Sequence, residues 1–212
     1  CDQCGTTWST DGTMGERKPE LDHGTMIPLR FLQEYLPEVR LVRIGLSGLP
    51  PMEHYRLGQC IARTAEKLGR RVVFIASGDL SHKLLAEGPY GFAPQGPEFD
   101  ARCTAALAQG DFLSLLQMDA NFCEAAAECG LRSFWIMAGA LDKKAVEAKL
   151  LSYEGPFGVG YGVASLFVQG EDGQRDFGTQ FEAEKQCRLA ARKAQEDPFV
   201  KLARHSLETY VH

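Results

Sequence analysis

The chain has 212 residues, of which 44% are hydrophobic and 24% charged, enough to bury the core of one large domain or of one domain plus a smaller segment. Its formal net charge of -5 and the lack of a Lys- or Arg-rich run argue against nucleic acid as a partner. No apolar stretch reaches the roughly 18 residues of a membrane-spanning helix, and no secretory signal pattern is present. The sequence therefore predicts a cytoplasmic protein with no membrane partner.

The seven cysteines support the same compartment. They are an odd number in a chain too large to need disulfides for stability, which favours reduced thiols. Cys1 and Cys4 have CxxC spacing, but a structural zinc site needs four ligands, and no second CxxC or HxxxH pair completes one. The sequence therefore predicts free thiols without a structural zinc site.

The first predicted unit is strand, helix, strand. Residues 41–46 are typical of a strand, and Pro50-Pro51 precedes a segment whose apolar residues recur with helical spacing. Gly69 suits the end of that helix. Residues 71–76 form a continuous, β-branched apolar run, as expected of a strand covered on both faces. This order predicts two parallel strands joined by a right-handed helical crossover.

The next segments predict helices over residues 99–108, 112–118 and 131–141. Gly110 separates the first two, and Asp111 is placed to cap the second. Residues 149–153 and 161–168 then resemble two strands on either side of the glycine-rich loop 154–160. A phosphate-binding loop would need a helix after it, whereas a strand follows here, so a flexible turn between strands is the better interpretation.

The C-terminal part is more polar. Residues 170–197 resemble a linker that carries a solvated helix over about 182–195. Asp197-Pro198 is a good helix start, with a capping residue followed by proline at the first helical position. Apolar residues line one face of the helix that follows, and this face has no partner in the last fifteen residues of the chain: Phe199, Ala203, Leu207 and Tyr210.

The candidate catalytic residue is His82, in the turn Ser77-Gly-Asp-Leu-Ser-His82 after the second predicted strand. Sites in open α/β sheets lie beyond the carboxyl ends of strands. An imidazole there can act as a general base, and a neighbouring carboxylate such as Asp79 could tune it. A lone histidine of this kind is more often a hydrogen-bonded structural group, so the residues alone leave both interpretations open.

Two further candidates carry weaker local signals. His23 precedes Gly24, where backbone can approach a ligand, but a simple turn explains it equally well. Glu124 and Glu128 share a helix face, and carboxylates with imidazole are the ligands of non-haem iron sites. The alternative for these two carboxylates is a solvated helix end next to Cys129.

Four segments in this order resemble the class III extradiol (LigB-type) dioxygenase superfamily, and within it the Memo-like proteins of the AmmeMemoRadiSam group. They are Asp22-His-Gly-Thr-Met-Ile-Pro-Leu29, Ser77-Gly-Asp-Leu-Ser-His82, Glu128-Cys-Gly-Leu-Arg-Ser133 and Ser152-Tyr-Glu-Gly-Pro-Phe-Gly-Val-Gly-Tyr-Gly162. The resemblance covers about residues 20–168. The tail over residues 197–210 resembles the opening of an AMMECR domain.

The resemblance implies an α/β fold, with a central mostly parallel or mixed sheet flanked by helices, incomplete at the N-terminus. The expected domains are a partial dioxygenase-like domain (1–169), a linker (170–197) and the start of an AMMECR-like domain (198–212). The implied reaction is the opening of a catecholic ring with O2 at Fe(II) or another divalent metal. The expected partners are a small aromatic substrate, O2, the downstream AMMECR-like domain and a second copy in a homodimer.

In this resemblance His82 matches the proton-handling position, His23 lines the substrate pocket, and the third metal ligand falls at Glu128 or Cys129. The two metal histidines of the family lie upstream of the Asp22-His23-Gly24 segment, where this chain has no histidine. We therefore expect either a slice of a longer protein, which the missing start methionine favours, or a domain that has lost its metal. The alternative function is a Memo-like metal- or ligand-binding domain without ring cleavage, part of a radical-SAM-associated system.

Overall fold

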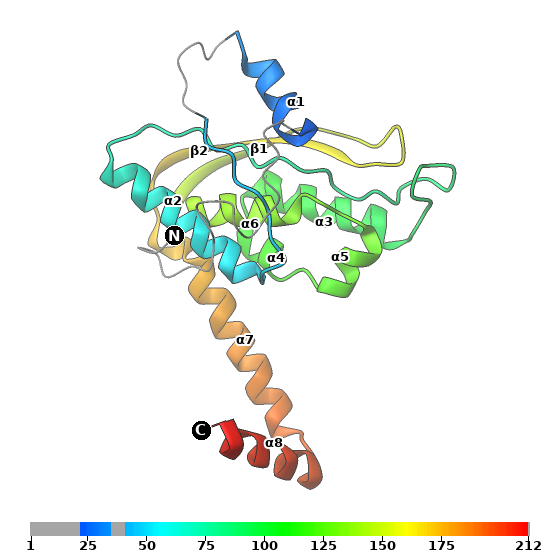
Figure 1. Ribbon diagram of the computed structural model, residues 1–212, viewed down its shortest axis with the longest axis vertical. Coiled ribbons are helices and arrows are strands. Elements are labelled where there is room, and N and C mark those ends of the chain that lie inside the picture. Colours follow the sequence, from blue (N-terminus) through cyan, green and yellow to red (C-terminus); the bar gives the residue numbers. More distant parts are fainter. Residues whose placement is uncertain (1–21, 35–40, 212) are drawn as a thin grey trace.

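The structure, a computed structural model, describes residues 22–34 and 41–211 (Figure 1). In this part of the chain two strands, β1 (Lys144–Glu154) and β2 (Tyr161–Glu171), pair in an antiparallel sheet. The helices are α1 (His23–Leu32), α2 (Pro51–Lys67), α3 (Gln95–Gln109), α4 (Phe112–Leu116), α5 (Ala120–Ala126), α6 (Leu131–Ala140), the 3₁₀ turn η2 (Gly173–Arg175), α7 (Phe177–Ala194) and α8 (Pro198–Val211).

The helices α2 and α6 pack backbone to backbone through glycine. A Cβ added at Gly58 would lie 1.9 Å from the carbonyl oxygen of Ile136, and one added at Gly139 would lie 1.9 Å from that of Tyr55. Only a residue without a side chain permits this approach. Both helices were predicted from the sequence, and the structure confirms them.

The helices around this pair begin and end at the residues that the sequence singled out. Gly110 adopts a left-handed conformation with φ 65° at the end of α3. The Asp111 carboxylate then accepts a hydrogen bond of 3.1 Å from the Ser114 backbone N–H and caps α4. The two helices predicted over 99–108 and 112–118 are confirmed as α3 and α4, with small shifts at their ends.

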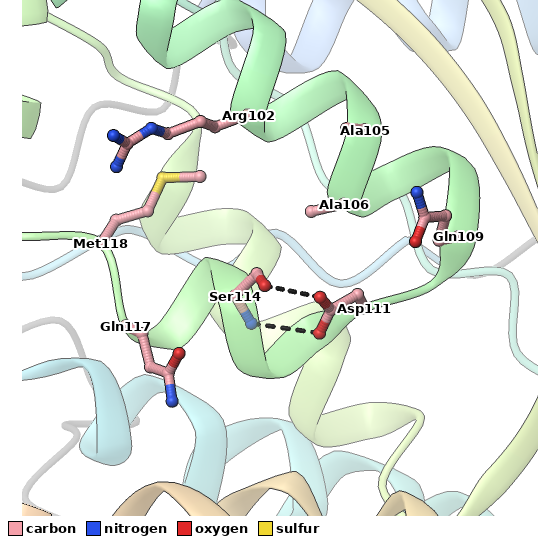
Figure 2. Close-up of a pocket in the computed structure, with 8 residues that line it drawn as sticks. All are labelled: Arg102, Ala105, Ala106, Gln109, Asp111, Ser114, Gln117 and Met118. Carbon is pink, nitrogen blue, oxygen red and sulfur yellow. Dashed lines mark hydrogen bonds between the residues drawn. The ribbon is translucent and has the colours of Figure 1, made fainter.

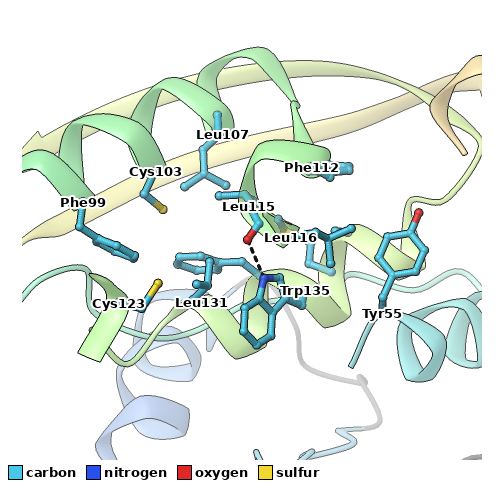
Figure 3. Close-up of a cluster of buried hydrophobic side chains, with 14 of the residues drawn as sticks. Tyr55, Phe99, Cys103, Leu107, Phe112, Leu115, Leu116, Cys123, Leu131 and Trp135 are labelled. Carbon is cyan, nitrogen blue, oxygen red and sulfur yellow. Dashed lines mark hydrogen bonds between the residues drawn. The ribbon is translucent and has the colours of Figure 1, made fainter. Parts of the chain in front are cut away.

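The hydrophobic core lies where α2, α3, α4 and α6 meet (Figure 3). Phe99, Phe112 and Leu115 have 0% of their surface exposed. Burial of an aromatic or leucine side chain contributes about 1.5–3 kcal/mol relative to exposure. The indole Nε1–H of Trp135 donates a 2.8 Å hydrogen bond to the Leu115 carbonyl oxygen, so the one polar group of that side chain is satisfied inside the core.

The hairpin β1–β2 lies over α3 (Figure 1). Its register pairs Lys144 with Glu171 at one end and Glu154 with Tyr161 at the other. The two predicted strands are therefore confirmed, and loop 154–160 is the turn between them, as expected. That loop is tied down, however, because the Leu84 backbone N–H donates a 3.1 Å hydrogen bond to the Gly158 carbonyl oxygen.

The prediction of a central, mostly parallel or mixed sheet is wrong for the described residues, whose one sheet has two antiparallel strands. Residues 41–46 and 71–76 form neither a strand nor a helix. Phe74 and Ala76 pack against the core, whereas Val73 is 81% exposed, so the second segment is covered on one face only. The apolar run predicted a strand, but a strand requires a neighbouring strand to pair with its backbone, and none pairs with this segment among the described residues.

The start of α7 packs against the core through Phe177 and Phe181, and the rest of α7 and α8 extend away from it (Figure 1). The helix α7 is longer than the predicted 182–195 segment, and α8 begins at Pro198, where Asp197 accepts hydrogen bonds from two backbone N–H groups. Phe199 is 85% exposed and Tyr210 is 91% exposed. This apolar face makes no contribution to the core, and the division into domains at 169 and 197 stays a prediction.

Free thiols are found at Cys103, Cys123, Cys129 and Cys187. Cys60 is disulfide-bonded, so the expectation of reduced thiols fails at this residue. Cys1 and Cys4 lie outside the described residues. Among the described helices, every one is too short or too polar to cross a membrane.

Candidate metal centre

The turn that carries His82 is fixed on two sides by backbone hydrogen bonds. Leu80 N–H donates to the Gly160 carbonyl oxygen at 2.9 Å, and Gly160 N–H donates to the Ser81 carbonyl oxygen at 2.7 Å. On the other side the His82 N–H and the Ser81 hydroxyl both donate to the carbonyl oxygen of Ala126, at 3.2 Å and 2.8 Å. The hairpin loop and the end of α5 therefore hold the turn in place.

Cys129 reaches the same turn from the start of α6. Its Sγ accepts a 3.2 Å hydrogen bond from the Asp79 backbone N–H, and its own N–H donates to the Asp79 carbonyl oxygen at 3.4 Å. A Cβ added at Gly78 would lie 2.4 Å from the Cα of Gly130, so this contact requires glycine. Two segments that lie 50 residues apart in the sequence are thus brought together.

Asp79, His82 and Cys129 form a cluster of three candidate metal ligands. One carboxylate oxygen, one imidazole nitrogen and the thiol sulfur all lie within 4.8 Å of one another. Carboxylate, imidazole and thiolate are all ordinary ligands of transition metals. Metal–ligand bonds of about 2.0–2.3 Å need only small side-chain movements to close on one ion. The Asp79–His82–Cys129 cluster therefore fits a divalent cation.

The imidazole of His82 is held with one nitrogen unsatisfied. Its ring stacks on Tyr90, with centroids 5.0 Å apart and planes at 25°. Nε2 lies 3.4 Å from Asp79 Oδ2, close enough for an ion pair if the ring is protonated, but the two atoms are not hydrogen-bonded. Nε2 is buried without a hydrogen-bond partner among the described residues. Such an atom is rare in folded proteins, and its lone pair is available either to a cation or to a proton of a bound molecule.

Glu128 and Cys129, the two candidates for the third metal ligand, are hydrogen-bonded to different parts of the structure. Burial raises the pKa of Glu128, and its carboxylate accepts a 2.7 Å hydrogen bond from the Leu131 N–H at the start of α6. Cys129 is partly exposed, but its sulfur contacts the turn that carries His82. Desolvation raises the pKa of this thiol. Metal coordination would offset that cost by stabilising the thiolate. The Cys129 sulfur therefore belongs to the cluster, whereas the Glu128 carboxylate is hydrogen-bonded to the start of α6.

His23 does not belong to the cluster. It is the first residue of α1, whose N-terminus is capped by Asp22 through a 2.9 Å hydrogen bond from the Thr25 N–H. The Ser77 hydroxyl donates to the Gly24 carbonyl oxygen at 2.7 Å, so the start of α1 touches the turn that carries His82. His23 itself is exposed. Glu124 is an exposed residue of α5.

Three residues of the site were not recognised from the sequence as members of it. Tyr90 stacks on His82, Asp100 receives a hydrogen bond from the turn, and Tyr153 donates to Asp100. Asp100 lies within a predicted helix and Tyr153 within a predicted strand, where each is typical of an exposed position. Neither carries a local signal, because their partners lie far away in the sequence.

A pocket of about 330 Å³ lies elsewhere, between α3 and α4 (Figure 2). Its polar side chains include Arg102, Asp111 and Ser114, and the last two are hydrogen-bonded to each other. Arg102 pairs with Glu98 and stacks over Phe122, so its charge is already engaged. No residue of the Asp79–His82–Cys129 cluster lines this pocket, and we assign the chemistry to the cluster.

Comparison with known proteins relates this chain to oxygenases. The family model described as the catalytic LigB subunit of aromatic ring-opening dioxygenase matches residues 10–164. Protein CA_C1420 of Clostridium acetobutylicum is 40% identical over 191 residues, which are 90% of this chain and 40% of that protein. The chain therefore spans well under half the length of that relative.

Two named dioxygenases match a shorter region. The 2,3-dihydroxyphenylpropionate/2,3-dihydroxicinnamic acid 1,2-dioxygenase 1 of Pseudomonas putida is 39% identical over 69 residues, 30% of this chain and 22% of that enzyme. The corresponding enzyme of Escherichia coli is 38% identical over 69 residues, with the same coverage. Because the family model covers most of its length, this chain belongs to the LigB family of aromatic ring-opening dioxygenase catalytic subunits.

Proposed function

We propose that the protein containing this chain is a metal-dependent oxygenase of the extradiol type, which opens a catecholic aromatic ring with O2 at Fe(II). Membership of the LigB family supports the reaction class. The observation that carries the proposal is the Asp79–His82–Cys129 cluster, in which an unsatisfied imidazole nitrogen lies beside a carboxylate and a thiol. We propose the use of an aromatic substrate, O2 and iron for the full-length protein that contains this chain.

In this proposal some residues of the cluster would bind the metal and another would transfer a proton. Cys129 and Asp79 would hold the cation, with further ligands supplied by the remainder of the protein, as the family resemblance implies. When bound, the metal would supply the Lewis acidity that binds a catecholate and O2 together. Nε2 of His82 would accept a proton from a substrate hydroxyl, and Tyr90 would keep the ring in place by stacking. His23 would orient the substrate from the start of α1.

A second candidate function is favoured by one observation, the thiol in the cluster. A carboxylate suits oxygen-activating Fe(II), whereas a thiolate favours softer metals such as Zn²⁺ or Cu(I). With Cys129 in the cluster, a Memo-like domain that binds metal without cleaving rings, within a radical-SAM-associated system, is the alternative. In either case we propose a cytoplasmic location and assembly as a homodimer.

We also propose that α8 begins an AMMECR-like domain of the same protein. The exposed apolar residues Phe199, Leu207 and Tyr210 support this, because they lie on one helix with no core of their own to enter. Expression of the full-length protein with Leu207→Asp tests it. Destabilisation of the downstream part alone is expected, and an unchanged melting profile would contradict the proposed domain.

The main experiment compares metal content and oxygen uptake with a panel of catechols in the full-length protein. Cys129→Ser should lower metal affinity by about 10- to 100-fold, since a ligand or its immediate support contributes on that scale. Cys187→Ser, which removes a free thiol on α7, is the matched control and should leave the metal content unchanged. Equal metal content in the two variants would contradict the metal site.

The same assay decides the role of His82. If the residue acts as the base, His82→Gln should retain metal and lose about 10²- to 10⁴-fold in turnover. If it is a ligand, His82→Gln should lose metal as Cys129→Ser does. If His82→Gln changed neither the metal content nor the rate of oxygen uptake, the turn that carries His82 would not belong to the active site.

A further inference from the structure

Asp100 is a buried carboxylate that no part of the proposed chemistry uses. It lies on α3 with 1% of its surface exposed. Its Oδ1 accepts a 2.7 Å hydrogen bond from the Ser81 backbone N–H, and its Oδ2 accepts one of 2.7 Å from the Tyr153 hydroxyl on β1. Burial of an ionisable group is costly unless its hydrogen bonds are made, so these two contacts are specific features of the fold.

The hairpin loop approaches this carboxylate so closely that only glycine fits. A Cβ added at Gly160 would lie 2.0 Å from Asp100 Oδ2 and 3.0 Å from the Leu80 side chain. Gly160 is also the residue whose backbone exchanges hydrogen bonds with Leu80 and Ser81. The helix α3, the hairpin and the turn before His82 therefore meet at one buried point.

This contact point lies directly next to the Asp79–His82–Cys129 cluster along the chain. Ser81, whose N–H is held by Asp100, is the residue directly before His82, and its side chain is fully buried. The backbone between Asp79 and His82 is therefore attached to α3 at its midpoint. Movement of Asp100 would displace the segment that sets the separation of the two side chains.

We infer that Asp100, Tyr153 and Gly160 form a clamp around the buried Asp100 carboxylate that sets the position of His82 in the cluster, which makes Asp100 a positioning residue. This inference rests on the proposed function of the cluster. The clamp acts through the Ser81 backbone and touches neither substrate nor metal. It explains why a carboxylate, which is rarely found fully buried, occupies a core position on α3.

The competing explanation is that Asp100 only stabilises the fold. The structure offers a control, because a second tyrosine donates the same kind of hydrogen bond to an aspartate. The Tyr55 hydroxyl donates to Asp142 Oδ1 at 2.6 Å, and Gln59 Nε2 donates to the other oxygen at 2.8 Å. Tyr55→Phe and Tyr153→Phe each remove one hydroxyl and leave each aspartate its other partner. Only the second change alters the clamp.

The experiment uses the full-length protein with ¹⁵N-labelled histidine, and the His82 ring signals are assigned by their loss in His82→Gln. In the metal-free protein, Asp100→Leu and Tyr153→Phe should shift the His82 ring signals, while Tyr55→Phe leaves them in place. Asp100→Asn should restore them, because its Oδ1 can still accept from Ser81 and its Nδ2 can donate to the Tyr153 oxygen.

A Co²⁺ titration, followed by thiolate-to-cobalt absorption, gives the second readout. Asp100→Leu should weaken Co²⁺ binding by about 10- to 100-fold, the scale of residues that orient a metal ligand. If the wild-type protein showed no such absorption, the proposed metal site would be refuted. The His82 ring signals alone would then show whether Asp100 positions His82. Loss of thermal stability in Asp100→Leu and Tyr153→Phe with unchanged His82 signals would overturn the inference, because Asp100 would then be purely structural.

Discussion

Replacement of Gly139 by alanine tests the backbone contact between α2 and α6. The new Cβ would lie 1.9 Å from the Tyr55 carbonyl oxygen and 2.9 Å from the Tyr55 Cα. Both are backbone atoms within a helix, so no side-chain rotation relieves the overlap. The two helices would have to separate by roughly 1 Å, and a gap of that size forfeits about half of the dispersion energy of each contact across it.

The expected loss of stability follows from two opposing effects. Overpacking of a core costs about 1–3 kcal/mol and sometimes more, and a clash with backbone belongs at the upper end of that range. Alanine is the better helix former by about 1 kcal/mol, which offsets part of the cost. We therefore expect Gly139→Ala to lower the free energy of unfolding by about 2 kcal/mol.

Denaturant-induced unfolding followed by circular dichroism measures this change. The control is Gly173→Ala in η2, where an added Cβ would meet no atom within 4 Å and φ is not positive. Its effect should stay within about 0.5 kcal/mol, as for other surface substitutions. If Gly139→Ala were as stable as the Gly173→Ala control, the close approach of α2 and α6 would be refuted.

Two further predictions concern the core and the buried carboxylate. Leu115→Ala, at 0% exposure, should destabilise the protein by about 2–5 kcal/mol in the same assay. Phe199→Ala, at 85% exposure, should change the stability by less than about 0.5 kcal/mol, and equal effects of these two changes would refute the core assignment. Burial raises the pKa of Asp100 above 3.8, so the folded state binds its proton more tightly than the unfolded state does. The stability of the wild type relative to Asp100→Asn should therefore rise as the pH falls through that raised pKa and level off below about 3.9, whereas a difference that stays constant with pH would contradict the burial effect.

Local sequence signals determined α2, α3, α4, α6 and the hairpin, whereas α1 was not predicted from the sequence. The glycine and aspartate at positions 110 and 111 end one helix and cap the next, as expected, because both effects depend on residues only a few positions apart. The cap at Asp197 and the turn between the two strands follow from the same local chemistry. Signals of this kind need no knowledge of what lies across the molecule.

The sheet and the site depend on tertiary contacts. Residues 71–76 have the composition of a buried strand, but whether an extended segment pairs is decided by the presence of a neighbour, which composition does not report. The sequence singled out His82 and Cys129 separately, and it left Glu128 as an equal alternative. Only the folded chain places the Cys129 sulfur beside Asp79 and directs Glu128 to the start of α6. The choice depends on contacts across 50 residues, for which local sequence patterns carry no distance information.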